Sequence, residues 1–286
     1  MSVIEFLLAL ALAKGLVVLG LLLLMRSGLV SFGQGLYFGL GAYAAALLAQ
    51  RAGIADAALM IVAGPACSAA VAAVLGLLLA RYRGIFFSML SLAFSMILYG
   101  LLVKSSALGS TDGFQIQVRQ LAGIALAPGA ERRMFFALSV PIVLALAWAL
   151  HRYLASHWGR LAAAIRDNEL RVEYLGASVY RVVYVNYIIA AALAGLGGAL
   201  AALAVGHVDP ETTYWTTSGE FVFIAILGGT GHVAAPLVAA VFFEALRTVA
   251  NQYAPNVWQM ALGASMLAII MFLPGGLWTL VRRKTA

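Results

Sequence analysis

The sequence predicts an all-α integral membrane protein, a polytopic bundle of about 8–10 transmembrane helices in a single domain over residues 1–286. Of its residues, 64% are hydrophobic and 10% are charged, and the mean hydropathy is +0.99. Soluble domains have about 45–50% apolar and about 25% charged residues. The apolar residues form long runs without alternation, such as residues 17–24, which favours helices over the strands of a barrel.

Apolar stretches define the expected spans, because a helix needs about 20 residues to cross the hydrocarbon core. They cover residues 3–25, 29–49, 57–80, 84–104, 134–154, 182–206, 219–231, 235–250 and 257–281. The first stretch is longer than the core of a signal peptide and has no basic start, so we expect a span there and no cleavable signal. The stretch 219–231 is short for a crossing and predicts a half-helix or a re-entrant segment.

Basic residues predict the orientation of these spans. The net charge is +7, and the arginines cluster at the ends of apolar runs, which reflects positive cytoplasmic loops and not nucleic-acid binding. The basic clusters lie at residues 81–83, 152–181 and 282–284. They share one side of the membrane if residues 105–133 and 207–218 face the other side. The exceptions to this pattern are Lys14, Arg119, Arg132 and Arg133.

The second apolar stretch is rich in glycine and polar side chains. Glycine at this density lets helix backbones approach closely, and the polar groups suit a helix beside a pore. Helix packing alone is the simpler interpretation. The candidate residues for pore lining or packing are Ser31, Gln34, Gly35, Tyr37, Gly39 and Gly41.

The connection at residues 157–181 is the most specific segment of the sequence. Leu161, Ile165, Val172 and Leu175 recur near helical spacing among charged residues, and Gly176 is suited to end a helix. We therefore expect one amphipathic helix on the cytoplasmic side. Such a helix either lies flat on the membrane or docks into the groove of a partner, and its mixed charge favours a protein partner over anionic lipid.

A few charged residues lie inside apolar runs. We interpret Glu220 as a first-turn acidic residue that suits the helix dipole, with Ser218 as the helix cap, in preference to a role in substrate binding. Glu244 and Arg247 can pair on one helix face, and Lys14 can anchor or pair likewise. An ion-driven carrier usually has several deep acidic groups, and Glu244 is the one clear example, which disfavours a secondary carrier or channel.

Motifs for catalysis, nucleotides or metals are missing from the sequence. No lysine follows a glycine-rich phosphate loop, and the four histidines form no cluster with the lone Cys67, which we expect to be a packing residue. We therefore expect a chain that is not an enzyme and that holds no metal and no cofactor of its own. A membrane enzyme is the least favoured alternative.

Several segments resemble, in order, the permease subunits of the branched-chain amino acid ABC transporter family, specifically the LivM type. The matching segments are residues 31–48, 81–100, 109–114, 159–181, 191–200, 219–247 and 272–278. Two motifs depart from the family pattern. The outer-loop motif reads Gly-Ser-Thr-Asp-Gly at 109–113, and Ala-Pro-Leu-Val-Ala-Ala stands at 235–240, where the family commonly has Gly-Pro-x-x-Gly-Ala.

The resemblance implies an importer in the bacterial inner membrane. This chain and a second, H-type permease chain would form the translocation pore. A periplasmic solute-binding protein would deliver the cargo, and two cytoplasmic ATPase subunits would bind ATP and Mg²⁺. The implied cargo is a branched-chain amino acid, although related importers carry urea, short amides or aromatic carboxylates.

The resemblance also implies roles for two connections. Within residues 157–181 it implies a coupling helix docked on an ATPase subunit, and residues 109–114 would form a periplasmic loop. The coupling candidates are Arg166, Asp167, Asn168, Glu169, Arg171, Leu175 and Gly176. The periplasmic candidates are Ser110, Thr111 and Asp112.

Overall fold

The computed structural model describes the chain with the exception of residues 1–2, 54–55, 117–119, 122–123, 126–130, 254–257, 273–275 and 279–286. Its α-helices are α1 (Val3–Arg26), α2 (Gln34–Arg51), α3 (Ala57–Leu79), α4 (Gly84–Lys104), α5 (Glu131–Ala155), α6 (His157–Asp167), α7 (Glu169–Tyr174), α8 (Val179–Val205), α9 (Trp215–Gly228), α10 (Ala234–Tyr253) and α11 (Trp258–Phe272). The shorter elements are the 3₁₀ helices η1 (Ser106–Leu108) and η2 (Pro210–Thr213) and the strands β1 (Phe114–Gln115), β2 (Gln120–Leu121), β3 (Ile124–Ala125) and β4 (His207–Val208). The predicted all-α fold class is confirmed.

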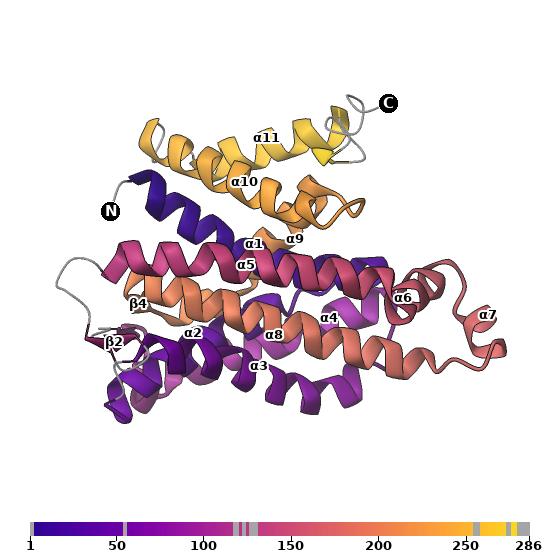
Figure 1. Cartoon of the computed structure of the whole chain (residues 1–286), viewed down its shortest axis with the longest axis horizontal. Coiled ribbons are helices and arrows are strands. Elements are labelled where there is room, and N and C mark those ends of the chain that lie inside the picture. The colour runs from indigo at the N-terminus through magenta and orange to yellow at the C-terminus, as the bar shows by residue number, and fades with distance from the viewer. Residues whose placement is uncertain are drawn as a thin grey trace.

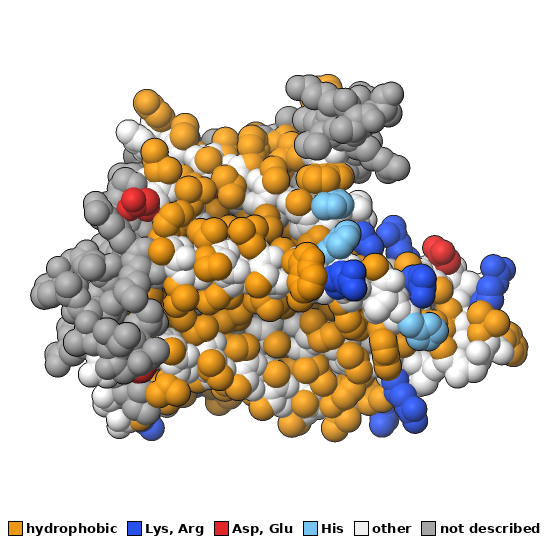
Figure 2. All heavy atoms as spheres, in the orientation of Figure 1, with side chains coloured by type: hydrophobic (Ala, Val, Ile, Leu, Met, Phe, Trp, Pro, Cys, Tyr) orange, Lys and Arg blue, Asp and Glu red, His pale blue; other side chains and the backbone are white. Residues whose placement is uncertain are grey.

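Long apolar helices make this chain a multi-pass membrane protein. In the described part of the chain, 6 helices are long and apolar enough to cross a bilayer, namely α1, α3, α4, α5, α8 and α10. The shorter helices α2, α9 and α11 pack beside them. Figure 2 shows a broad surface of hydrophobic side chains along the bundle, as expected for helices that face lipid.

Helices α1 and α8 form the centre of the bundle. In each, 78% of the most apolar 18-residue stretch is buried, against 22% in α3, α4 and α5, so these three helices are more peripheral. Small residues allow this close packing. A Cβ atom at Gly195 of α8 would lie 2.7 Å from the carbonyl oxygen of Gly64 in α3, and a Cβ atom at Gly20 of α1 would lie 2.7 Å from the carbonyl oxygen of Ala190.

Two connections re-enter the bundle beside α4. Ser88 Oγ donates to the carbonyl oxygen of Val30 (2.6 Å), and Ser91 Oγ accepts from the backbone N–H of Phe32 (3.1 Å). Ser95 Oγ donates to the carbonyl oxygen of Thr213 (2.7 Å), immediately before α9 begins. Helices α2 and α9 therefore start beside the interior of α4 and not at its ends. The stretch 219–231, in which we predicted a half-helix or a re-entrant segment, lies largely in α9, a helix of 14 residues that is short for a crossing.

The two ends of the bundle differ in chemistry. Helices α6 and α7 project from one end, where basic side chains gather, and we call this the basic end (Figures 1 and 2). The opposite end carries β1 and β4, which pair antiparallel, and we call it the strand end. The connections 105–133 and 207–218 thus meet at one end, as predicted. Two elements of that prediction, Arg119 and the cluster at 282–284, lie outside the described residues.

The contact between α3 and α8 gives a first test of this packing. We expect Gly195→Val to destabilise the protein by about 1–3 kcal/mol, because the added side chain overlaps Ser68 and the Gly64 carbonyl. Thermal unfolding in detergent measures the change. Gly100→Val is the matched control, since a Cβ atom at Gly100 of α4 meets nothing within 4 Å. Equal unfolding temperatures for the two variants would contradict the packing described.

Candidate functional site

Four ionisable side chains form a cluster inside the bundle, which we call the charge tetrad: Lys14, Glu220, Glu244 and Arg247. The ammonium group of Lys14 contacts Oε1 of both glutamates. Nη1 of Arg247 lies 3.4 Å from Oε1 of Glu220 and 3.7 Å from Oε1 of Glu244. The pairing of Glu244 with Arg247 along one helix face is therefore confirmed.

The tetrad joins three helices at a depth where charge is costly. Lys14 lies midway along α1, Glu244 lies in the interior of α10, and Glu220 lies in the second turn of α9. Two positive and two negative groups sum to zero, so the cluster carries no net formal charge. Pairing is what makes buried charges tolerable in a protein interior.

A cavity of about 260 Å³ borders the tetrad and reaches toward the strand end. Lys14, Glu220 and Arg247 form its inner wall. Its outer rim is polar and comes from β4, from η2 and from the residue between them, with His207, Asp209, Glu211 and Thr212. The side walls are small and apolar, with Ala42, Gly198, Ala201 and Ala202. A hollow with apolar walls and a few converging charged groups has the form of a binding site for a small polar solute.

The interpretation of Glu220 and Ser218 as a dipole-and-cap pair was wrong. Helix α9 begins at Trp215, so Ser218 lies inside the helix, where its Oγ accepts from the backbone N–H of Gly35 (2.9 Å) at the start of α2. Glu220 pairs with Lys14. The useful signal was that Lys14, Glu220 and Glu244 all lie in apolar runs, where charges require partners.

The polar candidates of the second apolar stretch are buried at the start of α2. Ser31 and Gln34 are fully buried, and the Tyr37 hydroxyl donates to that of Tyr187 (2.6 Å). Side chains at Gly39 and Gly41 would overlap Thr213 and Gly195. These residues pack against neighbouring helices, and the walls of the cavity come instead from other positions of α2. Their role as pore residues stays a prediction.

The segment expected to be one amphipathic helix is two helices at an angle. Asn168 has an extended backbone (φ −163°, ψ 106°) that separates α6 from α7, and its Oδ1 caps α7 by accepting from the N–H of Arg171 (2.9 Å). Ile165 and Val172 are buried as expected, but Leu175 is 80% exposed. Gly176 ends α7 in the left-handed region (φ 84°), as predicted.

Helix α7 forms an exposed apolar tip beyond the bundle (Figure 1). Leu170, Tyr174 and Leu175 are 65%, 89% and 80% exposed. Glu169 Oε1 accepts from Nε of Arg83 (2.7 Å), which ties the tip to the connection between α3 and α4. The coupling residues predicted from the sequence do not include Leu170 and Tyr174, although both are apolar residues on the polar side of the expected helix.

The predicted outer-loop residues form a compact turn at the strand end. Ser110 has a positive φ (48°), and its Oγ donates to the carbonyl oxygen of Val103 (2.9 Å). Gly113 has φ 67° and packs so closely on Val208 of β4 that a Cβ atom would overlap the Val208 carbonyl. Thr111 and Asp112 are exposed. These contacts hold β1 in register with β4.

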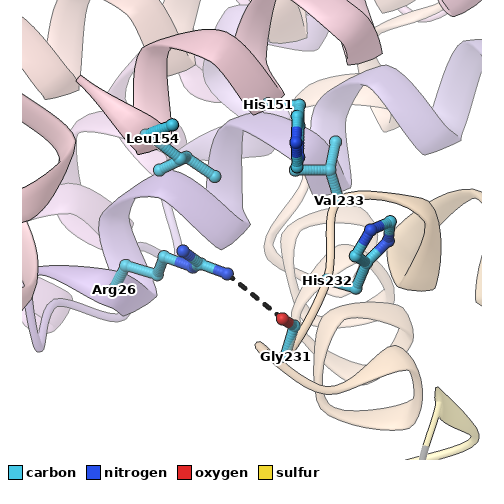
Figure 3. Close-up of a pocket in the computed structure, with 7 residues that line it drawn as sticks. Arg26, His151, Leu154, Gly231, His232 and Val233 are labelled. Carbon is cyan, nitrogen blue, oxygen red and sulfur yellow. Dashed lines mark hydrogen bonds between the residues drawn. The ribbon is translucent and has the colours of Figure 1, made fainter. Parts of the chain in front are cut away.

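A smaller cavity of about 180 Å³ lies at the basic end (Figure 3). Arg26 Nη2 donates to the carbonyl oxygens of Thr230 (3.2 Å) and Gly231 (3.3 Å) and so joins α1 to the turn between α9 and α10. The His232 ring stacks on Trp278 at 4.6 Å, and its Nδ1 accepts from the N–H of Ala234. The contacts of Arg26 and His232 are made to other residues of this chain, so we interpret the cavity as a junction between structural elements.

Comparison with known proteins identifies the family. A sequence model of the family described as the branched-chain amino acid transport system / permease component matches residues 3–272. The high-affinity branched-chain amino acid transport system permease protein LivM of Escherichia coli (strain K12) is 28% identical over 279 residues, which cover 90% of this chain and 65% of that protein. Its counterpart in Salmonella typhimurium is 29% identical over the same coverage.

This chain thus spans about 65% of the length of these curated relatives. No solved structure matches it. Because the family match covers nearly the whole chain, the protein belongs to the family of branched-chain amino acid transport system permease components.

Proposed function

We propose that this chain is the membrane-spanning permease subunit of an ATP-driven ABC importer, and that it forms half of a pore for branched-chain amino acids. The observation that carries the proposal is the family match over residues 3–272. The long apolar helices support a role in transport and not in catalysis. The chain acts as one transmembrane domain over residues 1–286, with its coupling segment at 157–181.

The proposal assigns each end of the bundle to one side of the bacterial inner membrane. The basic end faces the cytoplasm, because short cytoplasmic loops carry an excess of arginine and lysine. The strand end faces the periplasm, where a solute-binding protein delivers the cargo to the side on which the 260 Å³ cavity has its polar rim. The second half of the pore is an H-type permease chain.

Two cytoplasmic ATPase subunits supply the energy and bind ATP and Mg²⁺, while this chain holds no cofactor. The α7 tip docks into a groove of one ATPase subunit, where Leu170, Tyr174 and Leu175 are buried on binding. The pair Arg83–Glu169 carries the movement of the tip to α3 and α4. Arg166, whose Cγ would lie 3.5 Å from a Cβ atom at Gly28, carries it to the connection between α1 and α2.

A second candidate function is a secondary carrier that needs no ATPase. The half-helix α9 and the charge tetrad favour it, since carriers bind substrates at broken helices and use buried ionisable groups. Purification of the tagged chain from its native membrane distinguishes the two. We expect a second permease and two ATPase chains to accompany it; a chain that purifies alone and moves solute in liposomes without ATP would overturn the importer.

The coupling role is tested by changes at the tip. We expect Tyr174→Ala combined with Leu175→Ala to lower ATP-driven uptake by at least about tenfold, the size expected when apolar anchors of an interface are lost. Changing Glu169 and Arg171 to alanine together is expected to uncouple ATP hydrolysis from uptake. Uptake by purified complex in proteoliposomes, with ATP hydrolysis measured in parallel, checks both results.

Tyr253→Ala is the matched control for the tip, because Tyr253 is also 80% exposed but ends α10 at a distance from α7. Membrane content of every variant is measured, and we expect it to equal that of the unchanged protein. Full uptake by the tip variants would reject the coupling assignment.

The orientation is tested by cysteine labelling in a Cys67→Ala background. We expect a cysteine introduced by Asp112→Cys to react with an impermeant thiol reagent from the periplasmic side, because Asp112 is exposed at the strand end. We expect Arg171→Cys to react from the cytoplasmic side alone. Mass spectrometry of spheroplasts and inverted vesicles measures both, and the opposite pattern would invert the proposed topology.

A further inference from the structure

The four members of the charge tetrad are exposed to different degrees. The side chains of Lys14 and Glu244 are 7% and 5% exposed, whereas those of Glu220 and Arg247 are 20% and 37% exposed. Lys14 and Glu244 thus form an inner pair, and Glu220 and Arg247 form an outer pair on the wall of the 260 Å³ cavity. A tetrad that served only to hold helices together would gain from being sealed, because water and solutes weaken ion pairs.

The contact between the two members of the outer pair is also long. Its separation of 3.4 Å exceeds the roughly 2.7–2.9 Å of a strong hydrogen bond between a cation and a carboxylate. A solute with a carboxylate and an ammonium group can insert between Arg247 and Glu220 and bind one charge to each. Both charges of the solute are then paired, and Arg247 and Glu220 each keep a partner of opposite charge. Buried ions need such pairing.

Charge on the cavity wall selects among solutes. The inner wall carries the positive Lys14 and Arg247 against the negative Glu220, and the rim adds the negative Asp209 and Glu211. A simple carboxylate meets this acidic rim and finds no partner for Glu220. Urea and neutral amides have no charges to exchange with the outer pair. A zwitterion satisfies both members of it.

Size and position suit a single amino acid. The volume of about 260 Å³ is below the roughly 300–1,000 Å³ of pockets for drug-sized ligands. Leu10, Phe38, Ala42 and Ala201 give an apolar wall for an aliphatic side chain. Because Lys14 lies midway along α1 and lines the cavity, the cavity reaches well into the membrane from the strand end.

We infer that this cavity is a cargo-binding site within the permease chain, in which Arg247 binds the carboxylate and Glu220 binds the ammonium group of a zwitterionic, apolar amino acid. The inference rests on the proposed function as an importer and adds to it the residues that contact the cargo. It also separates amino acids from urea, amides and aromatic carboxylates as cargo of this chain.

Cysteine protection tests the site without relying on transport. Val205 lines the cavity and is 42% exposed, so a cysteine introduced by Val205→Cys in a Cys67→Ala background reports on its occupancy. The complete complex in nanodiscs, without binding protein, is labelled by a small neutral thiol reagent. We expect millimolar L-leucine to slow labelling at least threefold, and 4-methylpentanoate or isopentylamine at the same concentration to have little effect.

The labelling rate of the Asp112→Cys variant, whose cysteine lies outside the cavity, is the control for non-specific effects of L-leucine. We expect protection at position 205 to disappear with Arg247→Gln, to persist in part with Arg247→Lys, and to remain unchanged with Lys104→Gln, which removes one exposed charge at the strand end. Partial protection with Arg247→Lys would show that the loss with Arg247→Gln comes from the missing positive charge and not from misfolding.

ATP-dependent uptake of radiolabelled L-leucine by the same complex distinguishes the two levels of the proposal. Uptake without protection by L-leucine would overturn the site and leave the importer intact. Equal protection by L-leucine and 4-methylpentanoate would overturn the zwitterion selectivity. Absence of uptake of any amino acid by the complete complex would overturn the proposed function itself.

Discussion

Lys14 is the residue on which the arrangement of three helices depends. Its ammonium group lies midway along α1, where an unpaired charge costs at least about 2.5–3.5 kcal/mol in a membrane. Glu220 and Glu244 remove this cost, and they do so from α9 and α10. The C-terminal helices are thereby held against the central helix α1, and the surface they leave toward the strand end becomes the wall of the cavity.

A second constraint is the shortage of hydrogen-bond partners inside a membrane. Broken helices expose backbone groups that lipid cannot satisfy. Here the serines of α4 provide the partners, at Val30, Phe32 and Thr213. This is why α2 and α9 can begin deep in the bundle, and why a polar cavity can exist at that depth beside otherwise apolar helices.

The sequence predicted the fold class well, because composition and run length depend only on the solvent that surrounds a helix. It also predicted from length that the stretch 219–231 holds no full-length span, and from spacing on one helix that Glu244 pairs with Arg247. Local sequence patterns did not predict contacts between residues that lie far apart in the chain. Nothing near Glu220 indicates that its partner is Lys14, which is 206 positions away.

The break at Asn168 was missed for a different reason. The apolar spacing on both sides is compatible with one continuous helix, and Asn is tolerated within helices. Its side chain instead caps α7, and the separation lets Ile165 and Val172 both remain buried while Leu175 faces outward. Competition between a cap and a continuous helix depends on tertiary packing, which local periodicity does not report.

The hydrogen bonds made by Ser88, Ser91 and Ser95 of α4 have a consequence for the biogenesis of this protein. During synthesis the chain segment around residues 30–32 leaves the ribosome well before α4. Until α4 is inserted, the backbone groups of Val30 and Phe32 lack their serine partners. In the bilayer each unsatisfied group costs several kcal/mol. The first four helices must therefore settle as one cooperative unit, and α2 reaches its final depth only when that unit is complete.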